Sequence, residues 1–338
     1  MPDGLDLDAF AHWIDAERPG LLDRPLEATL ITGGKSNVTY AVSDGSTDVI
    51  VRRPPLGHVL ATAHDMAREH RVITALAPTA VPVPATHALC EDESVIGATF
   101  YVMERAAGTA FSQASDLAVL GAERTRDITG RMVDVLAELH AVDPAAVGLA
   151  DFGRPDGYLE RQVRRWKKQL DASRSRELPG MDDLVARLEG TIPSTGEGTI
   201  VHGDYRLDNL LVDTTDEDRI TAVLDWEMST LGDPLTDVAV LLAYQQLAEE
   251  APGAGRALVT DAAKAPGYLS REEVLARYAE RSGRDVSDID FHLALAFFKL
   301  AVILEGIHYR HSHGQTLGAG FDGIGDLIVP LIQAGLRA

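Results

Sequence analysis

Two short motifs near the middle of the chain restrict its fold and its chemistry more than any other feature. The first, HGDYRLDNLLVD at 202–213, places Asp204 and Asn209 five positions apart, and the second, VLDWEMSTLGDPLTD at 223–237, adds Asp225 after an apolar run. Phosphoryl transfer requires such a set, because one carboxylate accepts the proton of an attacking hydroxyl while an amide oxygen and a second carboxylate hold Mg²⁺ on the phosphates. The spacing therefore predicts Asp204 as the catalytic base, and Asn209 and Asp225 as metal ligands.

Each acid also has a simpler interpretation. Aspartate is common in turns, so Asp204 alone indicates no more than a surface turn, and Asp225 alone could cap the end of a strand. The two motifs together favour catalysis, because the amide stands at the required offset from the first acid. His202 is predicted to brace the loop, and Asp233 and Asp237 of GDPLTD are predicted to be loop braces or helix caps.

The order of apolar patterns along the 338 residues predicts two lobes. The front of the chain alternates strand-like runs and turns with helices at 5–18 and 64–77. The remainder has mostly helical spacing of its apolar residues, interrupted by a β-rich insert at 199–237 that carries both motifs. We therefore expect an α+β fold with a β-rich N-terminal lobe at 1–107 and a mainly helical C-terminal lobe at 108–338.

Several stretches resemble one family of small-molecule kinases. The pieces GGKSNVTY, VRRPPLGHVLATAHDM and YVMERAAG, together with the two catalytic motifs, are similar to the aminoglycoside phosphotransferase and choline kinase-like family. Within it, R-R-P-P followed by A-H-D-M most resembles the kinase domain found fused to acyl-CoA dehydrogenases. The resemblance covers about 31–313. It implies a bilobal protein-kinase-like fold, ATP or GTP as phosphate donor with Mg²⁺, and an alcohol group as acceptor, such as that of a hydroxyacyl-CoA or a hydroxy acid.

The resemblance places the nucleotide loop at GGKSN between two strand-like runs. Gly33, Gly34, Ser36 and Asn37 are therefore predicted to contact the phosphates. A Walker A loop is excluded, because that motif requires a glycine at the position of Thr29 and a helix afterwards, whereas NVTYAV is strand-like. A plain glycine hairpin stays open as the simpler interpretation.

The same resemblance assigns the rest of the nucleotide site. Arg52 in VIVRRPP stands where kinases carry a lysine, and it can hold phosphate with two donors, although arginine and lysine are not interchangeable. Glu69 in the following helix is predicted to pair with Arg52, or else to be a solvated helix glutamate. Residues 104–106, with Glu104 and Ala106 at either end, are predicted to be the hinge that offers backbone groups to adenine.

Two stretches bear on the acceptor. Seven basic residues in 161–176 oppose the global charge of −21, and Arg164, Arg165 and Trp166 are candidates to hold an anionic acceptor, the alternative being a solvated helix face. In LEGIHYRHSHGQ, Glu305, His308 and Tyr309 are candidates for the pocket wall, or for an ordinary helix end. The H-x-x-H-x-H spacing there matches no firm zinc pattern.

Composition limits the classes of partner. The net charge of −21 argues against nucleic acid and could favour a cationic substrate, although acidic side chains also serve solubility. No uncharged apolar run approaches the roughly 20 residues that span a bilayer, so we expect no membrane partner. Cys90 is the single cysteine, and the acidic N-terminus lacks a secretory pattern, so we expect a cytoplasmic protein. The sequence leaves the oligomeric state open.

Three functions are compatible with these residues. The favoured one is a small-molecule phosphotransferase that moves the γ-phosphate of ATP to a hydroxyl. An aminoglycoside-type antibiotic kinase would suit the acidity of the chain. A nucleotide-binding pseudokinase is indicated only by Arg52 and is opposed by Asp204, Asn209 and Asp225.

Overall fold

The computed structural model describes residues 4–31, 37–56, 64–194, 196, 198–250, 260–314 and 323–338. Within these the chain forms two compact units. The first contains residues 1–108 and 221–229, and the second contains 109–220 and 230–338. The division differs from the predicted boundary at 107–108 in two respects: Gly108 and the segment 221–229, which includes Asp225, belong with the first unit.

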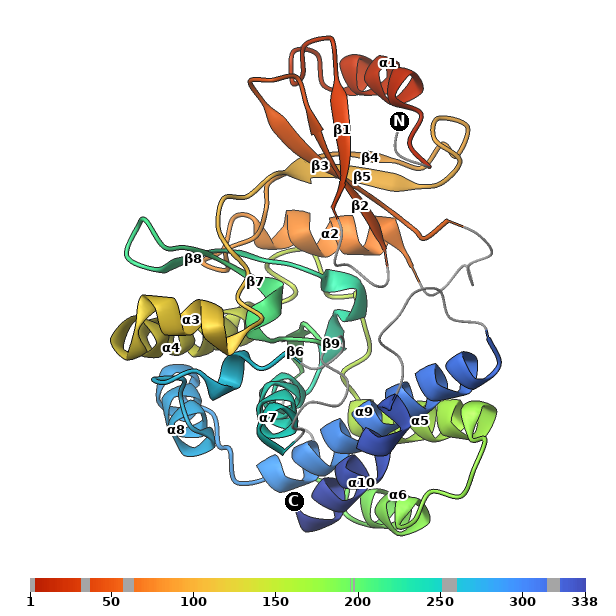
Figure 1. Cartoon of the computed structure of the whole chain (residues 1–338), viewed down its shortest axis with the longest axis vertical. Coiled ribbons are helices and arrows are strands. Elements are labelled where there is room, and N and C mark those ends of the chain that lie inside the picture. Colours follow the sequence, from red (N-terminus) through yellow and green to blue (C-terminus); the bar gives the residue numbers. More distant parts are fainter. Residues whose placement is uncertain are drawn as a thin grey trace. The chain divides into compact units, whose positions relative to one another are not determined.

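The first unit is built on an antiparallel sheet of order β1-β2-β3-β5-β4 (Figure 1). Its strands are β1 (Glu27–Ile31), β2 (Val38–Ser43), β3 (Asp48–Arg53), β4 (Thr86–Cys90) and β5 (Phe100–Glu104). The predicted hairpin turn joins β2 to β3 with Ser43 paired to Asp48, and Asp44 closes it by accepting the N–H groups of Ser46 and Thr47 at 2.7 and 2.6 Å. Turn chemistry in the sequence thus sets the register of β3.

Each face of this sheet is covered by a helix. Side chains alternate across a strand, so Val49 and Val51 of β3 join the apolar cluster formed with α1 (Leu7–Glu17), whereas Arg52 faces the other way. On that opposite face lies α2 (Met66–Leu76), which contacts β4 and β5 and begins at Asp65, whose side chain caps Arg68 N at 2.9 Å. Both helices lie within their predicted ranges, and the pleat places Arg52 on the face that α2 covers.

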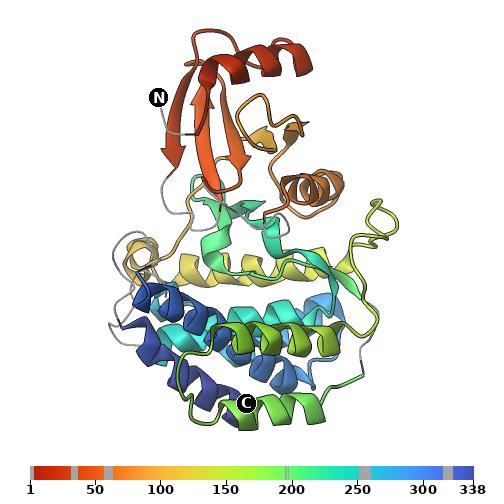
Figure 2. The same ribbon diagram turned by 90° about the vertical axis from the view of Figure 1, so that its right-hand side faces the viewer.

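The second unit is mainly helical. Its helices are α3 (Ala114–Leu120), α4 (Ala122–Ala141), α5 (Tyr158–Ser173), α6 (Met181–Gly190), α7 (Leu235–Glu250), α8 (Arg271–Ser282), α9 (Ile289–Ser312) and α10 (Ile328–Arg337). Figure 2 shows them stacked in layers, with α4 and α6 at opposite ends of the stack. Helix α9 packs against α5, α6, α7 and α10, and 78% of its most apolar 18-residue window is buried. It is long and apolar enough to cross a membrane, but this burial is that of a core helix.

Short strands and 3-10 turns carry the catalytic motifs. In the second unit, β6 (Thr199–Val201) pairs antiparallel with β9 (Thr230–Gly232). The first motif continues through η1 (Leu207–Asn209) into β7 (Leu210–Asp213), which neighbours β8 (Arg219–Val223). The chain enters the first unit within β8 and forms η2 (Trp226–Met228) there. Val223 N bonds to Pro82 O at 2.8 Å, which ties this segment to the first unit.

Candidate active site

Arg52 is the centre of a buried ion-pair group in the first unit. Its Nε lies 3.1 Å from a carboxylate oxygen of Glu69 on α2, and its terminal nitrogen lies 2.5 Å from Oδ1 of Asp225 before η2. The exposed fractions are 13% for Arg52, 1% for Glu69 and 32% for Asp225. Burial alone would lower the pKa of Arg52, but the neighbouring carboxylates raise it, so the guanidinium stays charged. Three predicted site residues are therefore brought together in one unit.

Asp225 is held in an uncommon backbone conformation. It has φ 66° and ψ 61°, in the left-handed region that non-glycine residues rarely adopt. Trp226 fixes the next turn, because it is 1% exposed and its indole N–H donates to Val223 O at 2.9 Å. A strained backbone persists where its surroundings over-determine it, and here the strain aims the carboxylate at Arg52.

Asn37 has a different role from the predicted one. It is 5% exposed, its amide nitrogen donates to Glu227 at 3.0 Å, and its amide oxygen lies 2.8 Å from Nδ1 of His64. Both ends of the amide are thus engaged, so Asn37 holds the end of the glycine loop to the segment that follows Asp225. Gly33, Gly34 and Ser36 of that loop lie outside the described residues.

The predicted hinge follows β5. Glu104 is exposed, its N–H donates to Ala85 O at 2.8 Å, and its carboxylate accepts from Ala85 N at 3.2 Å. The N–H of Glu104 is therefore already bonded within the chain, to Ala85 at the edge of the sheet. Ala106 is half-buried. A role of 104–106 in holding adenine stays a prediction.

The catalytic loop in the second unit is organised around Asp237. This fully buried carboxylate accepts the backbone N–H groups of His202 at 2.6 Å and Gly203 at 2.7 Å, and it lies 3.2 Å from Nε2 of His140. Burial would raise its pKa, but these bonds lower it below the ordinary value, so Asp237 is ionised. Burial lowers the pKa of His140, and Tyr278 completes its bonding by lying 2.8 Å from Nδ1. The prediction of Asp237 as a loop brace agrees with this geometry.

Asp204 and Asn209 face each other within this loop. The Asn209 amide nitrogen donates to Asp204 O at 2.8 Å and to its carboxylate Oδ2 at 3.3 Å. Both bonds use the nitrogen, so the amide oxygen is the atom that can coordinate a metal. Asp204 N lies 3.2 Å from Nδ1 of His202, which is buried and braces the turn as predicted. The loop therefore presents a carboxylate and an amide oxygen side by side.

A second layer of polar groups surrounds Asp204. The guanidinium of Arg206 stacks over the ring of Tyr244 at 4.3 Å and pairs with Asp208, which accepts from Thr260 at 3.1 Å. Burial raises the pKa of Tyr244, and the charge of Asp204 adds to this effect. Tyr244 and Thr260 could not be predicted from the sequence motifs, because they lie in helical or loop segments without a motif of their own.

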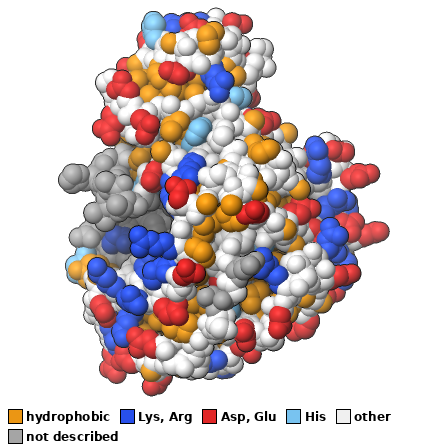
Figure 3. All heavy atoms as spheres, turned by 180° about the vertical axis from the view of Figure 1, so that it is seen from behind, with side chains coloured by type: hydrophobic (Ala, Val, Ile, Leu, Met, Phe, Trp, Pro, Cys, Tyr) orange, Lys and Arg blue, Asp and Glu red, His pale blue; other side chains and the backbone are white. Residues whose placement is uncertain are grey.

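The predicted acceptor residues on α5 divide into two groups. Arg164 and Arg165 are exposed, and Figure 3 shows Lys and Arg side chains gathered at the side of the second unit where α5 lies. Trp166 is 4% exposed and lines a small cavity beside Gly203, so a role in stacking on a ligand stays a prediction that its burial disfavours. Its ring instead packs in the core, with the Arg165 guanidinium 5.5 Å and the Lys299 ammonium 5.7 Å from the ring centroid.

The candidates at the end of α9 are mostly structural. Glu305 is fully buried and accepts from the backbone N and the hydroxyl of Ser175 at 3.2 and 3.0 Å and from Arg176 at 3.3 Å. Glu305 therefore braces the chain at the end of α5, and this differs from its predicted place in the pocket wall. His308 and Tyr309 are half-buried, and the Tyr309 ring packs against His313 at 4.3 Å. Among the described residues, no group of three His, Cys, Asp or Glu could hold a metal.

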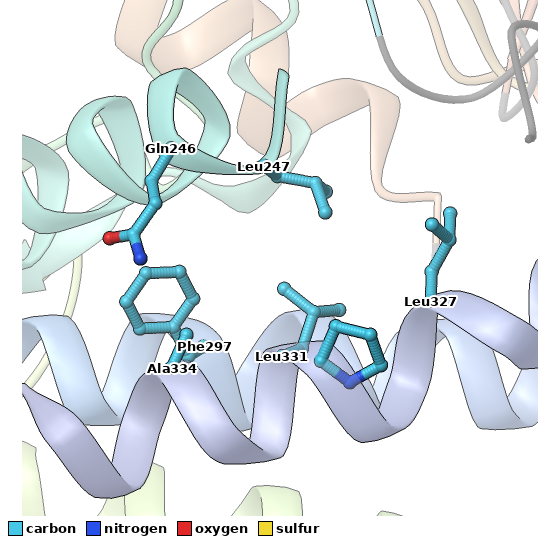
Figure 4. Close-up of a pocket in the computed structure, with 7 residues that line it drawn as sticks. Gln246, Leu247, Phe297, Leu327, Leu331 and Ala334 are labelled. Atoms are coloured by element: carbon cyan, nitrogen blue, oxygen red, sulfur yellow. The ribbon is translucent and has the colours of Figure 1, made fainter. Parts of the chain in front are cut away.

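Two small cavities lie in the second unit. One of about 40 Å³ is apolar and lies between α7, α9 and α10, with Leu247, Phe297 and Leu331 in its wall (Figure 4). The other, of about 30 Å³, is lined by Gly203 of the catalytic loop, Asp237 and Lys299 among others. Each has room for about one or two water molecules, so neither holds a whole acceptor.

The donor set suits Mg²⁺. This ion prefers hard oxygen ligands and keeps several waters, so one or two protein ligands suffice beside phosphate oxygens. Asn209 offers an amide oxygen, and Asp225 offers the carboxylate oxygen that Arg52 does not hold. Each of these two side chains is by itself a suitable donor for the ion, and their roles as metal ligands stay predictions.

Comparison with known proteins identifies the family. A model of the phosphotransferase enzyme family, APH, matches residues 27–274. The chain belongs to this family. The predicted resemblance and the kinase-like α+β fold are confirmed. The chain has the nucleotide-binding fold of the kinases in this family of transferases.

Three relatives show how far the likeness extends. A Ralstonia eutropha protein provisionally described as an aminoglycoside phosphotransferase is 36% identical, with a TM-score of 0.84 over 98% of this chain and 97% of that one. Aminoglycoside phosphotransferase APH(4)-Ia, solved with AMP-PNP and hygromycin B, has a TM-score of 0.62 at 15% identity over 97% and 98% of the two chains, which shows the fold alone. Acyl-CoA dehydrogenase family member 10 of Mus musculus is 37% identical over 87% of this chain. The chain spans only 27% of that protein.

Proposed function

We propose that this phosphotransferase moves the γ-phosphate of ATP, or of GTP, to the hydroxyl of a small molecule. The observation that carries the proposal is the pairing of Asp204 with Asn209 on one braced loop, at 3.3 Å between amide nitrogen and carboxylate. This arrangement combines a base and a metal ligand, as direct phosphoryl transfer requires.

The chain's own residues have separate tasks in this reaction. Asp204 orients the acceptor hydroxyl and accepts its proton as oxygen bonds to phosphorus, and Asn209 keeps that carboxylate in place. Arg52 binds phosphate oxygens while Glu69 fixes its direction. Mg²⁺, held by Asn209 and Asp225, would neutralise charge on the phosphates when bound. No phosphoenzyme is needed, because the acceptor oxygen attacks the γ-phosphorus and the nucleoside diphosphate, ADP or GDP, leaves.

The acceptor we favour is a hydroxyacyl group carried on coenzyme A, or the corresponding hydroxy acid. Two observations support this class: the exposed Arg164 and Arg165 on α5, which suit phosphate groups, and the likeness to a region of acyl-CoA dehydrogenase family members. We propose a small-molecule partner and not nucleic acid or a membrane, since the net charge of −21 repels polyanions.

A product screen tests the reaction type. Purified protein with Mg-ATP or Mg-GTP is incubated with hydroxyacyl-CoAs, free hydroxy acids and aminoglycosides, and new phosphorylated species are sought by mass spectrometry. We expect a product that depends on Mg²⁺ and is absent with Asp204→Ala. Nucleotide binding without any Asp204-dependent product would indicate a pseudokinase, and phosphorylated aminoglycosides alone would indicate an antibiotic kinase.

Charge reversal tests the acceptor class. The double variant Arg164→Glu, Arg165→Glu should raise the KM for a hydroxyacyl-CoA and leave the KM for the free hydroxy acid unchanged, because only the ester carries the extra phosphates. Arg219→Glu is a matched control at a side chain that is 63% exposed. An unchanged KM for the ester in the double variant would refute the role of α5.

A further inference from the structure

The most apolar stretch of helix α9 contains one charged residue. Between Phe291 and Leu304, Lys299 is the single Lys, Arg, Asp or Glu. Its neighbours Phe298 and Leu300 are 0% and 4% exposed. Lys299 itself is half-buried. The partial burial of its ammonium disfavours the charged form, lowers its pKa and so costs some folding free energy. A charged side chain that lowers stability at an apolar position indicates a functional role.

The ammonium of Lys299 is aimed at the catalytic loop. Its Nζ donates to Gly203 O at 2.6 Å, and it lies 5.7 Å from the centroid of the Trp166 ring. The charged groups around it come from three elements: Asp204 in the loop, Asp237 on α7 and Arg165 on α5. The two acids favour the ammonium, and the arginine opposes it.

The carbonyl that Lys299 holds belongs to the peptide immediately before the base. The other side of that peptide is the N–H of Asp204, which lies 3.2 Å from Nδ1 of His202. Gly203 has φ +87°, so no side chain restrains the turn, while its own N–H is held by Asp237 at 2.7 Å. Both sides of the 203–204 peptide are therefore fixed, one from the loop and one from α9.

We propose that Lys299 is a positioning residue for the base Asp204. It holds the 203–204 peptide plane, so the carboxylate of Asp204 points where the acceptor hydroxyl must lie. This inference rests on the proposed function and adds to it a residue outside both catalytic motifs. Misplacement of a reacting group by about 1 Å can cost about 100-fold in rate, so a single hydrogen bond at this peptide matters.

Lys299→Met separates positioning from a merely structural role. Methionine keeps the length of the side chain and removes the hydrogen bond and the charge. We expect kcat to fall about 10- to 100-fold, with the KM values of nucleotide and acceptor and the affinity for nucleotide unchanged. We expect the melting temperature to stay equal or to rise, because the variant removes a charge from a half-buried position. Lys299→Arg should restore part of kcat, and Lys264→Met, at an exposed lysine, is the control.

Several results would overturn the proposal. A wild-type kcat in Lys299→Met would do so, and so would a loss of kcat that only follows a loss of folded protein. Should Lys299→Met not fold, Lys299→Gln replaces it, since its amide can still donate to Gly203 O and should retain more activity than Lys299→Ala. If the wild type shows no turnover with any acceptor, the proposed function fails; hydrogen exchange then decides for Lys299, since the peptide covering 202–209 should exchange faster in the variant.

Discussion

The ion pair between Arg52 and Glu69 should be the largest single polar contribution to the stability of the first unit. Glu69 is 1% exposed, so removal of its partner by Arg52→Met leaves a buried carboxylate without a counter-charge and should cost about 3–5 kcal/mol. Asp225 is 32% exposed and can be solvated, so it adds little to this cost. Arg52→Lys keeps the charge but not the fork that reaches two carboxylates, and should cost about 1.5–3 kcal/mol.

The chain allows this unit to be followed by itself. Of the three tryptophans, Trp13 and Trp226 lie in the first unit and Trp166 in the second, so a Trp166→Phe background confines fluorescence to the first. Urea unfolding in that background would compare Arg52→Met, Glu69→Met and the double variant. Replacement of both partners by apolar groups should cost much less than the sum of the two single changes. Additive costs, or a cost below about 1 kcal/mol for Arg52→Met, would refute the reasoning.

Three further predictions concern the second unit. Burial lowers the pKa of His140 below its ordinary value of 6.5, so below that pH the unfolded chain binds a proton that the folded state excludes. The free energy of unfolding should therefore fall on acidification from about pH 6.5. His140→Gln should remove up to about 1.4 kcal/mol per pH unit of that dependence, measured by urea unfolding between pH 7 and 5. The same change of unfolding free energy with pH in the wild type and in His140→Gln would contradict this prediction. Glu305→Leu should cost about 1–3 kcal/mol and leave the acceptor KM unchanged, because that carboxylate is a brace; a raised KM at unchanged stability would restore it to the pocket. Gly267→Ala should lower the melting temperature far more than Gly148→Ala, since both have positive φ but a Cβ at Gly267 would lie 1.9 Å from Ala122 O; equal losses would contradict the clash.

Much of the fold follows from local patterns. Asp44 and its turn set the β2–β3 register. Because side chains alternate along a strand, Val51 then faces α1 and its neighbour Arg52 faces α2. Glu69 follows from the helical period of α2. These positions could be predicted because each depends on residues close in sequence. The role of Asn37 could not, since its partner Glu227 is 190 positions away and no local pattern distinguishes a loop amide that holds phosphate from one that holds a carboxylate.

Helix α9 shows why the remaining site residues needed the fold. Its two interior charges, Lys299 and Glu305, are six positions apart and therefore about 240° apart around the helix axis. On a surface helix the apolar stripe would indicate which of them faces a site, but α9 is packed against helices on several sides, so the sequence has no polar face to give the direction. Proximity to the end of the helix favoured Glu305, which braces Ser175, whereas Lys299 reaches Gly203. In a helix packed on several sides, each interior charge must be explained by the partner that stabilises it, and for Lys299 that partner is the peptide before the catalytic base.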